Sequence, residues 1–553
     1  MNKHKKKIDL ILAFVINFIF LNIYTRYFWL IQESNDDLAM SFMAEGAYGS
    51  YSEYLIFENV LWGKFLVGMY QWMPSIKWYN VTFFIMIFVS FWQMSYVFLR
   101  AQGRKIGSAV SAIMLIFCGY HTYVLFQFSR VTSIATIGGM IMLFYALEHA
   151  EDKLERNLCV LAGGALTIWA SMMRFQMFGV CVILVGGALA IYRLWKLLRE
   201  KPVDLKKQIL TYIGVFGVVG GLCLGLHLVD NAFYEMNPQW KEYKEYNEIR
   251  ADLWDTGFPD YNANYEMYQS LGISENDFIY FLSWEMDEEV LTLDVLKTIQ
   301  AAKPQRTFSL SSFLDTFPKG FLGMSVYTLF VVLALAAIAL DKKCIYFVAY
   351  EFIMVMCFEA LFFWMRRFGV ERIDSGMWMA ACLTLLYATS ETLSQRKEHA
   401  GRWSIAAAGI AMIVSMSLLN GYTHIQLGKV GSTKSFYQEV TADKEHLYVM
   451  LTTAPSVYYA YNFWEPCQQG DLSNVYNAFG WEYNVEVKHE ILENYGITNI
   501  YRDSINNDDI YFIAGPQAVR LEVYIRENYH PDAYLNYIGS IGDYFVWSIK
   551  VDE

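Results

Sequence analysis

The stretch IQESNDDLAMSFMAEGAYGS, residues 31–50, follows a long apolar run and contains two adjacent carboxylates, Asp36 and Asp37. The run before it extends from about Ile8 to Ile31. A helix of about 20 apolar residues spans the hydrocarbon core of a bilayer, so this run is long enough to cross. The sequence therefore places a pair of acids where the chain leaves the membrane.

The composition indicates a membrane protein with many spans. Hydrophobic residues make up 55% of the 553 residues and charged residues 18%, well below the roughly 25% of soluble domains. A net charge of −12 argues against nucleic-acid binding, which needs a basic surface. The eight cysteines show neither CxxC nor Cys/His spacing, so neither a zinc site nor a disulfide framework is indicated.

We expect about eleven spanning helices, because only helices satisfy the backbone of an apolar run in lipid. Their expected starts are Ile8, Tyr79, Ile106, Val131, Leu158, Phe175, Ile209, Phe321, Ile345, Ile373 and Ser404. Cytoplasmic loops are enriched in Lys and Arg, so the basic start of the chain is expected in the cytoplasm. With eleven spans, four further basic loops fall on the same side, at 100–105, 193–207, 341–343 and 396–402.

Three segments are then expected outside: 32–78, 230–319 and 421–553. Within the first, Tyr54–Pro74 is predicted as an amphipathic helix in the membrane interface, because charged residues interrupt its apolar pattern. The segment 230–319 interleaves Tyr and Trp with acids. That pattern suits sugar recognition, although charge runs are also common on solvated surfaces.

The fold class predicted is a polytopic α-helical membrane protein with a C-terminal extracytoplasmic α/β domain. The membrane domain is expected over residues 1–420, including the outer loops 32–78 and 230–319. The α/β domain is expected over 421–553, where strand-like segments such as HLYVMLTT and DIYFIAG alternate with helix-like ones.

Asp36 and Asp37 have two interpretations that are compatible with each other. They can occupy the cap and first turn of a helix, where acids suit the helix dipole. One of them can also act as a general base, since a low-dielectric wall raises a carboxylate's pKa toward neutrality. The second acid would then orient the first or hold a divalent cation such as Mg²⁺ or Mn²⁺. No other cofactor is indicated.

Five arginines lie at expected outer ends of spans, where short loops normally avoid basic residues. A lipid-linked phosphate would explain them, because guanidinium groups bind phosphate bidentately. The alternatives are snorkelling to lipid headgroups or pairing with the acidic outer loop. The candidates for binding a donor phosphate are Arg130, Arg174, Arg366, Arg367 and Arg372.

Three further acids are candidates for assisting the reaction or contacting an acceptor. Glu53 and Glu58 lie in the first outer loop, and Glu359 lies inside an expected span. An ionisable residue within a span is a functional candidate. Glu359 is also about two turns before Arg366, so it can instead be the structural partner of that arginine.

The arrangement resembles the GT-C glycosyltransferases, membrane enzymes that use lipid-phosphate-linked sugars, such as protein mannosyltransferases and the aminoarabinose transferase. Three features carry the resemblance: Asn35-Asp36-Asp37 directly after the first span, the interfacial helix Tyr54–Pro74, and seven spans followed by the long loop 230–319. The segments NDD, EGAYGS and EYL are also similar to GtrII-like membrane proteins of Gram-positive bacteria.

The resemblance implies that Asp36 or Asp37 deprotonates an acceptor hydroxyl, which attacks the sugar of a polyprenyl-phosphate donor with inversion. The expected acceptor is an envelope glycan, lipid or protein, and the expected location is a bacterial plasma membrane. Two alternatives stay open. One is a polysaccharide polymerase or ligase centred on arginines. The other is a flippase or transporter for lipid-linked sugars, which would keep its binding residues near the bilayer midplane.

Overall fold

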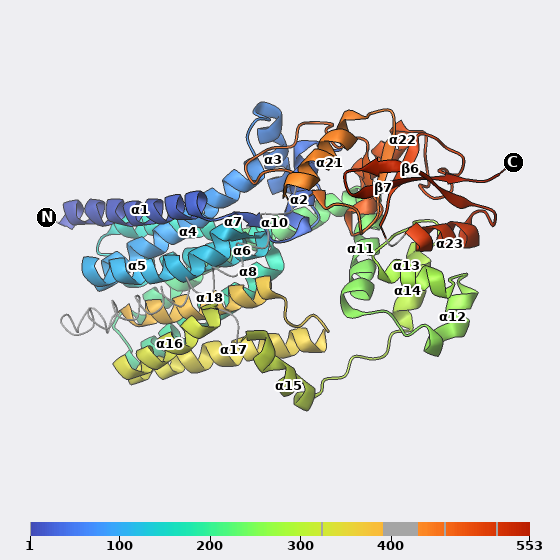
Figure 1. Cartoon of the computed structure of the whole chain (residues 1–553). Helices are drawn as coiled ribbons and strands as arrows, with labels where there is room; N and C mark the ends of the chain where they lie inside the picture. Colours follow the sequence, from blue (N-terminus) through green and yellow to red (C-terminus); the bar gives the residue numbers. More distant parts are fainter. Residues whose placement is uncertain (1, 322–324, 391–429, 458–459, 516–517, 553) are drawn as a thin grey trace.

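The computed structural model describes residues 2–552 except 322–324, 391–429, 458–459 and 516–517. Long helices run side by side at one end of the molecule, and a five-stranded sheet with several short helices lies at the other (Figure 1). The predicted class, a polytopic helical membrane protein with a C-terminal sheet, is confirmed.

The bundle is built from helices whose starts mostly match the apolar runs. They are α1 (Asn2–Tyr27), α4 (Trp78–Gln102), α5 (Arg104–Gly119), α6 (Phe128–Glu148), α7 (Lys153–Met173), α8 (Phe175–Cys181), α9 (Ala188–Glu200), α10 (Leu205–Met236), α16 (Ser325–Leu340), α17 (Ile345–Trp364) and α18 (Glu371–Ala388). A π-helical turn joins α8 to α9, and another extends α5 to Val124.

Seven helices in the described ranges are long and apolar enough to cross a membrane. They correspond to the spans expected from Ile8, Tyr79, Ile106, Val131, Phe175, Ile209 and Ile345. The spans expected near Leu158, Phe321 and Ile373 correspond to α7, α16 and α18, which do not meet the same length and hydropathy limits. The span expected from Ser404 lies outside the described residues, so the number eleven stays a prediction.

Ion pairs gather at the end of the bundle that carries the N-terminus, called the N-terminal end below. Asp9 is buried, and its carboxylate oxygens accept hydrogen bonds from Arg100 at 3.3 Å and from Arg104 at 2.6 Å. Lys6 reaches Glu155 at 2.7 Å. The start of the chain and the turns near residues 100–104 and 151–155 therefore share one end, as the basic-loop pattern requires. The side of the membrane on which this end lies stays a prediction.

At the opposite end, called the α2 end below, the chain forms α2 (Asn35–Glu45) and α3 (Val60–Trp72) between α1 and α4. Two short strands, β1 (Ile31–Gln32) and β2 (Leu125–Phe126), pair in parallel there. The expected helix over Tyr54–Pro74 begins later, at Val60. Asn59 caps it by accepting the Leu61 N–H, while the chain before Asn59 turns Glu58 inward.

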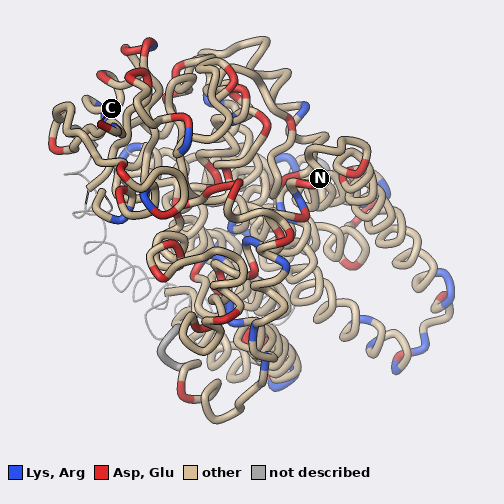
Figure 2. Tube along the Cα trace, turned by 90° about the vertical axis from the view of Figure 1, so that its right-hand side faces the viewer, with Lys and Arg blue, Asp and Glu red and all other residues tan. Residues whose placement is uncertain are grey.

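The segment between α10 and α16 forms four helices beyond the α2 end, namely α11 (Pro238–Thr256), α12 (Tyr265–Ser270), α13 (Glu275–Leu282) and α14 (Leu293–Ala301) (Figure 1). A fifth helix, α15 (Leu310–Phe321), lies beside α17. Acidic positions are spread widely over this side of the molecule, which faces the viewer in Figure 2.

The C-terminal region, residues 430–552, contains α21 (Val430–Ala442), β3 (Leu447–Met450), β4 (Val475–Asn477), α22 (Glu486–Asn494), β5 (Ile510–Ile513), α23 (Ala518–Asn528), β6 (Tyr534–Ile541) and β7 (Tyr544–Lys550). The sheet order is β4-β3-β5-β7-β6, with β3 parallel to β4 and β5, and with β7 antiparallel to β5 and β6. The boundary expected at 421 lies outside the described residues and stays a prediction.

Close packing of α6 against α7 depends on two glycines. A Cβ on Gly163 would lie 2.9 Å from the Gly139 carbonyl oxygen, and one on Gly139 would lie 2.3 Å from Thr167 Oγ1. Small residues let helix backbones approach in membranes, where apolar burial alone does not drive association. The contact holds α6, which is buried along almost its whole length, in the centre of the bundle.

We expect Gly163→Leu to destabilise the bundle by about 1–3 kcal/mol, because the added side chain must push α6 and α7 apart. Gly217→Leu on α10 is the matched control, since a Cβ there meets nothing within 4 Å. Thermal unfolding in detergent measures both. Equal unfolding midpoints for the two variants would contradict this account of the α6–α7 contact.

Candidate active site

Helix α2 places the two acids at the α2 end of the bundle. It runs from Asn35 to Glu45 and is capped by Gly46, whose φ of 71° is left-handed. Asp36 and Asp37 therefore lie in its first turn, as expected, although Ser34 rather than an acid occupies the N-cap position. Successive residues of a helix point about 100° apart, so the two carboxylates face different surroundings.

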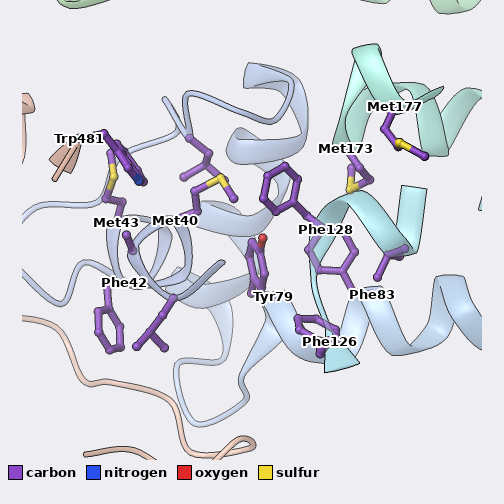
Figure 3. Close-up of a cluster of buried hydrophobic side chains, with 14 of the residues drawn as sticks. Met40, Phe42, Met43, Tyr79, Phe83, Phe126, Phe128, Met173, Met177 and Trp481 are labelled. Atoms are coloured by element: carbon purple, nitrogen blue, oxygen red, sulfur yellow. The ribbon is translucent and has the colours of Figure 1, made fainter. Parts of the chain in front are cut away.

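Asp37 is fully buried and tied to three other segments. Its Oδ1 accepts the Phe128 N–H at 2.9 Å and the Tyr79 hydroxyl at 3.1 Å, and its Oδ2 accepts the Ser34 hydroxyl at 3.0 Å. Burial, with a further contribution from the charge of Asp36, raises the pKa of Asp37 to about 8. Figure 3 shows Tyr79 and Phe128 close to α2.

Asp36 keeps an exposed face, with 15% of its side chain accessible. Its Oδ1 accepts the indole N–H of Trp481 at 3.0 Å, and its Oδ2 lies 4.0 Å from Arg372 Nη2. Burial raises the pKa of Asp36, while Arg372, Arg174, the Trp481 hydrogen bond and Arg250 oppose this shift. Of the two acids, Asp36 is therefore the one that an incoming molecule can reach.

Arg174 joins α7 to α8 and lies near Asp36. Its guanidinium lies over the rings of Phe57 and Phe128, with Cζ 4.8 Å and 5.4 Å from the two ring centroids. Among the described residues it has no hydrogen-bond or ion-pair partner. Burial lowers the pKa of Arg174 to about 10, partly offset by Asp36, so the group stays cationic at neutral pH. Its N–H donors are available to a ligand.

The other predicted arginines differ in their surroundings. Arg372 is the second residue of α18, and 37% of its side chain is exposed. Arg366 and Arg367 lie in the turn between α17 and α18; the backbone of Arg366 is left-handed, and Arg367 is ion-paired with Asp255 at the end of α11. The charges of Arg367 and Arg372 both act on Arg174, so this part of the α2 end is strongly cationic.

Arg130 lies in the interior rather than facing the Asp36 surface. Its side chain is fully buried, and Nε and Nη2 each contact a carboxylate oxygen of Glu33 at 2.7 Å. Its Nη1 donates to His121 Nδ1 at 2.8 Å. These donors are used within the protein, so we leave Arg130 out of the phosphate site proposed below.

Among the auxiliary acids, Glu58 is buried and receives the Tyr79 hydroxyl at 2.7 Å, the same hydroxyl that reaches Asp37. Burial raises the pKa of Glu58 well above its usual value. A hydroxyl carries one proton, so a protonated Glu58 can donate to Tyr79 while Tyr79 donates to Asp37. Glu53 is part exposed on the surface, 4.0 Å from Lys64.

Glu359 is buried in α17 beside Asp374 of α18. The interpretation of Glu359 as the partner of Arg366 is therefore not supported, since the nearest acidic or basic partner given by the structure is another carboxyl group. Neither acid is in contact with Asp36, so Glu359 stays a prediction as an auxiliary acid.

Two residues near Asp36 were not predicted. Arg250 of α11 is buried, donates from Nε to Asn247 Oδ1 at 2.9 Å, and adds positive charge near Asp36. Trp481 comes from the C-terminal region, 445 residues from Asp36 in sequence. Arg250 belongs to the Tyr- and Trp-rich segment that suggested sugar recognition, whereas no pattern marked Trp481.

The acid pair does not fit a divalent cation in this arrangement. Both oxygens of Asp37 accept hydrogen bonds, and the oxygens of Asp36 face an indole N–H and a guanidinium. In the described part of the chain, no group of three or more His, Cys, Asp or Glu side chains is arranged to hold a metal ion. We therefore derive no step through a metal ion.

No family model and no curated protein matches the sequence. Among solved structures, the chain is similar to ArnT from Cupriavidus metallidurans in the apo state, with 9% identity and a TM-score of 0.44 over 98% of this chain and 97% of that one. ArnT bound to undecaprenyl phosphate gives 10% identity and a TM-score of 0.41 over the same shares.

The chain is also similar to the archaeal oligosaccharyltransferase AglB from Archaeoglobus fulgidus, in complex with an inhibitory peptide and a dolichol-phosphate. The identity is 9% and the TM-score 0.43, over 98% of this chain and 74% of that one. ArnT and AglB belong to the GT-C superfamily. At these identities and TM-scores, the chain's own residues must carry any functional conclusion.

The raised pKa of Asp37 predicts a pH-dependent stability. An ordinary carboxyl group in the unfolded chain ionises near pH 4, whereas folded Asp37 holds its proton to about pH 8. The folded state therefore binds more protons between these values, and its stability falls as pH rises through them. We expect Asp37→Asn to flatten this decline in thermal unfolding between pH 5 and 8. Exposed Asp532→Asn should not, and an unchanged slope for Asp37→Asn would contradict the assignment.

The Arg130–Glu33 pair predicts a second stability effect. Glu33→Gln leaves a buried guanidinium without its countercharge, so we expect a loss of about 3–5 kcal/mol. Glu53→Gln, which breaks an exposed pair, should cost less than about 1 kcal/mol. Denaturation in detergent measures the free energy of unfolding of both variants. Equal losses of stability in Glu33→Gln and Glu53→Gln would show that Glu33 does not hold Arg130.

Proposed function

We propose that this protein is an integral-membrane glycosyltransferase. It would transfer a sugar from a polyprenyl-phosphate donor to a hydroxyl of an envelope glycan, lipid or protein, on the outer face of the plasma membrane. One observation carries the proposal: the partly exposed carboxylate of Asp36 lies beside the guanidinium of Arg372 and near the guanidinium of Arg174, which has no hydrogen-bond or ion-pair partner among the described residues. A base and anion-binding groups thus meet at one rim of the bundle.

The cations favour a phosphate as the group recognised. Arg174 has donors that no described residue uses, and Arg372 is partly exposed, so both can meet an incoming phosphate. The rings of Phe57 and Phe128 hold Arg174 from one side, which fixes its direction without using its hydrogens. A donor carried by a prenyl chain would bring its phosphate to this rim from the bilayer.

The chemistry then follows from the two kinds of group. Asp36 takes the proton of an acceptor hydroxyl, and the acceptor oxygen attacks the anomeric carbon. The bond from that carbon to the phosphate oxygen breaks, and the lipid phosphate leaves with the electron pair. Arg174 and Arg372 stabilise the charge that develops on it. Attack opposite the leaving group inverts the anomeric configuration, so no covalent sugar on the protein is needed.

Asp37 has a different role in this proposal. Its oxygens are occupied by Phe128, Tyr79 and Ser34, so it holds the first turn of α2 and thereby aims Asp36. The short chain of hydrogen bonds from Glu58 through Tyr79 to Asp37 supports that placement.

A polysaccharide polymerase or ligase is the second candidate, favoured by the number of arginines near the site: Arg174, Arg250, Arg367 and Arg372. Such an enzyme would rely on the cations and not require a base at Asp36. A transporter would instead use the buried acids Glu351, Glu359 and Asp374 between α17 and α18.

Substitution of single acids separates these functions. We expect Asp36→Asn to lower transfer by about 10²–10⁴-fold, the usual contribution of a general base, while the protein stays folded. Asp260→Asn, an exposed acid in the 230–319 segment, is the matched control and should act like wild type. The measurement is the sugar content of surface glycans in a deletion strain that carries each variant, together with thermal unfolding.

Wild-type glycans in the strain with folded Asp36→Asn would contradict the base assignment and favour a polymerase or transporter. If Glu351→Gln rather than Asp36→Asn removed the sugar, transport through the α17–α18 pair would be the better explanation.

A further inference from the structure

The C-terminal region reaches the candidate site through one side chain, Trp481. This residue follows β4 by four positions, after a turn at Gly480 with a φ of 79°. It is 5% exposed, and its Nε1–H donates to Asp36 Oδ1 at 3.0 Å. Figure 3 shows the indole next to α2, beside Met43. The hydrogen bond joins the two parts of the chain at the proposed base.

Contacts with three other segments hold Trp481 and its neighbour Glu482 in place. Its ring meets that of Phe57 edge to face, with centroids 5.3 Å apart at 72°. The Trp481 carbonyl accepts the hydroxyl of Tyr243 on α11 at 2.6 Å. The next residue, Glu482, accepts the Tyr48 hydroxyl at 2.9 Å. Phe57 and Asp36 thus hold the indole itself, while the hydrogen bonds of Tyr243 and Tyr48 hold the backbone that carries it.

Main-chain hydrogen bonds hold the C-terminal region in register with the far end of the same helix. The Gly470 N–H donates to the Gly46 carbonyl at 3.0 Å, and the Leu472 N–H donates to the Ala47 carbonyl at 2.8 Å. The Cys467 N–H donates to Glu45 Oε2 at 2.6 Å. The C-terminal region therefore forms hydrogen bonds with both ends of α2, at its last turn and at Asp36 in its first turn.

We propose that Trp481 is a positioning residue for Asp36, so that the C-terminal region completes the active site. This inference rests on the proposed function. The indole N–H occupies Oδ1 and sets the rotation of the carboxylate. Oδ2 then faces the side where Arg372 lies and is the oxygen left to receive the acceptor's proton.

The polar end of the indole, rather than its bulk, carries this role. A phenylalanine would keep much of the ring contact with Phe57 but would leave Oδ1 without its donor. A hydrogen bond to an ionised carboxylate favours the ionised form, so its loss makes Asp36 harder to deprotonate. Asp36 would also gain rotational freedom, which lowers the fraction of molecules with the base in place.

Trp481→Phe tests the proposal, with Trp464→Phe as the matched control. Trp464 lies in the same region and packs against Phe84 of α4, with ring centroids 4.7 Å apart. Its indole N–H donates no hydrogen bond to another described residue. Turnover of the purified full-length protein is measured as release of undecaprenyl phosphate from synthetic undecaprenyl-phosphate glucose, galactose and mannose, with water supplying the acceptor hydroxyl. We expect Trp481→Phe to lower kcat by about tenfold or more, with little change in KM, because an N–H bond to a charged group is lost.

The pH profile separates positioning from a general structural defect. Loss of the N–H should move the acid limb of the kcat profile to higher pH in Trp481→Phe, while Trp464→Phe should keep the wild-type profile. An unchanged kcat and acid limb in folded Trp481→Phe would overturn the proposal. An equal effect of Trp464→Phe would overturn it as well, because the indole N–H would then not be the cause.

A second measurement does not depend on turnover. The second measurement is the NMR signal of the Trp481 indole N–H in ¹⁵N-labelled protein, assigned by its absence in Trp481→Phe. This signal should shift with pH in wild type and not in Asp36→Asn. An indole signal that is the same in Asp36→Asn and wild type across pH would overturn the proposal. If wild type turns over none of the three probes but the signal titrates with Asp36, the contact stands and these three compounds are not donors for this protein.

Discussion

The arrangement of the α2 end depends on the hydrogen bonds of one buried carboxyl group, that of Asp37. It accepts hydrogen bonds from the residue before α2, from the first turn of α4 and from the first residue of α6. The N–H groups at the start of a helix have no partner within it, so a buried carboxylate at the start of α6 satisfies a group that would otherwise be costly. Once Asp37 is fixed, the preceding residue must point elsewhere on the helix. Asp36 therefore faces Trp481 and Arg372.

The surroundings of that carboxylate come from distant parts of the chain. Arg174 lies between α7 and α8, Arg372 lies in the first turn of α18, and Trp481 follows β4. The bundle supplies the cations, and the C-terminal region supplies the donor that orients the acid. A membrane domain alone would present Asp36 without that donor, which gives a physical reason for a globular region fused to a bundle of apolar helices.

Much of this organisation follows from local sequence. Apolar runs marked the long helices, because only helices satisfy the backbone in lipid, and NDD after the first run marked the first turn of α2. The cationic grouping of Arg174 and Arg372 near Asp36 was also expected from their places at span ends. The pairing of Arg130 with Glu33 was not foreseen, because Glu33 lies in the same outer stretch but was not considered. Neither Trp481 nor the choice between Asp36 and Asp37 was predictable, since both depend on contacts across hundreds of residues and on which face of α2 is buried.

A structure of the protein with a bound undecaprenyl-phosphate hexose, determined by electron cryomicroscopy, tests the central claim most directly. The account predicts the lipid phosphate in contact with the guanidinium groups of Arg174 and Arg372, and the anomeric carbon on the side of Asp36 that faces them. A phosphate bound at the opposite end of the bundle would contradict it. The cavity of about 590 Å³ lined by Arg193, Lys196 and Arg199 is one such place.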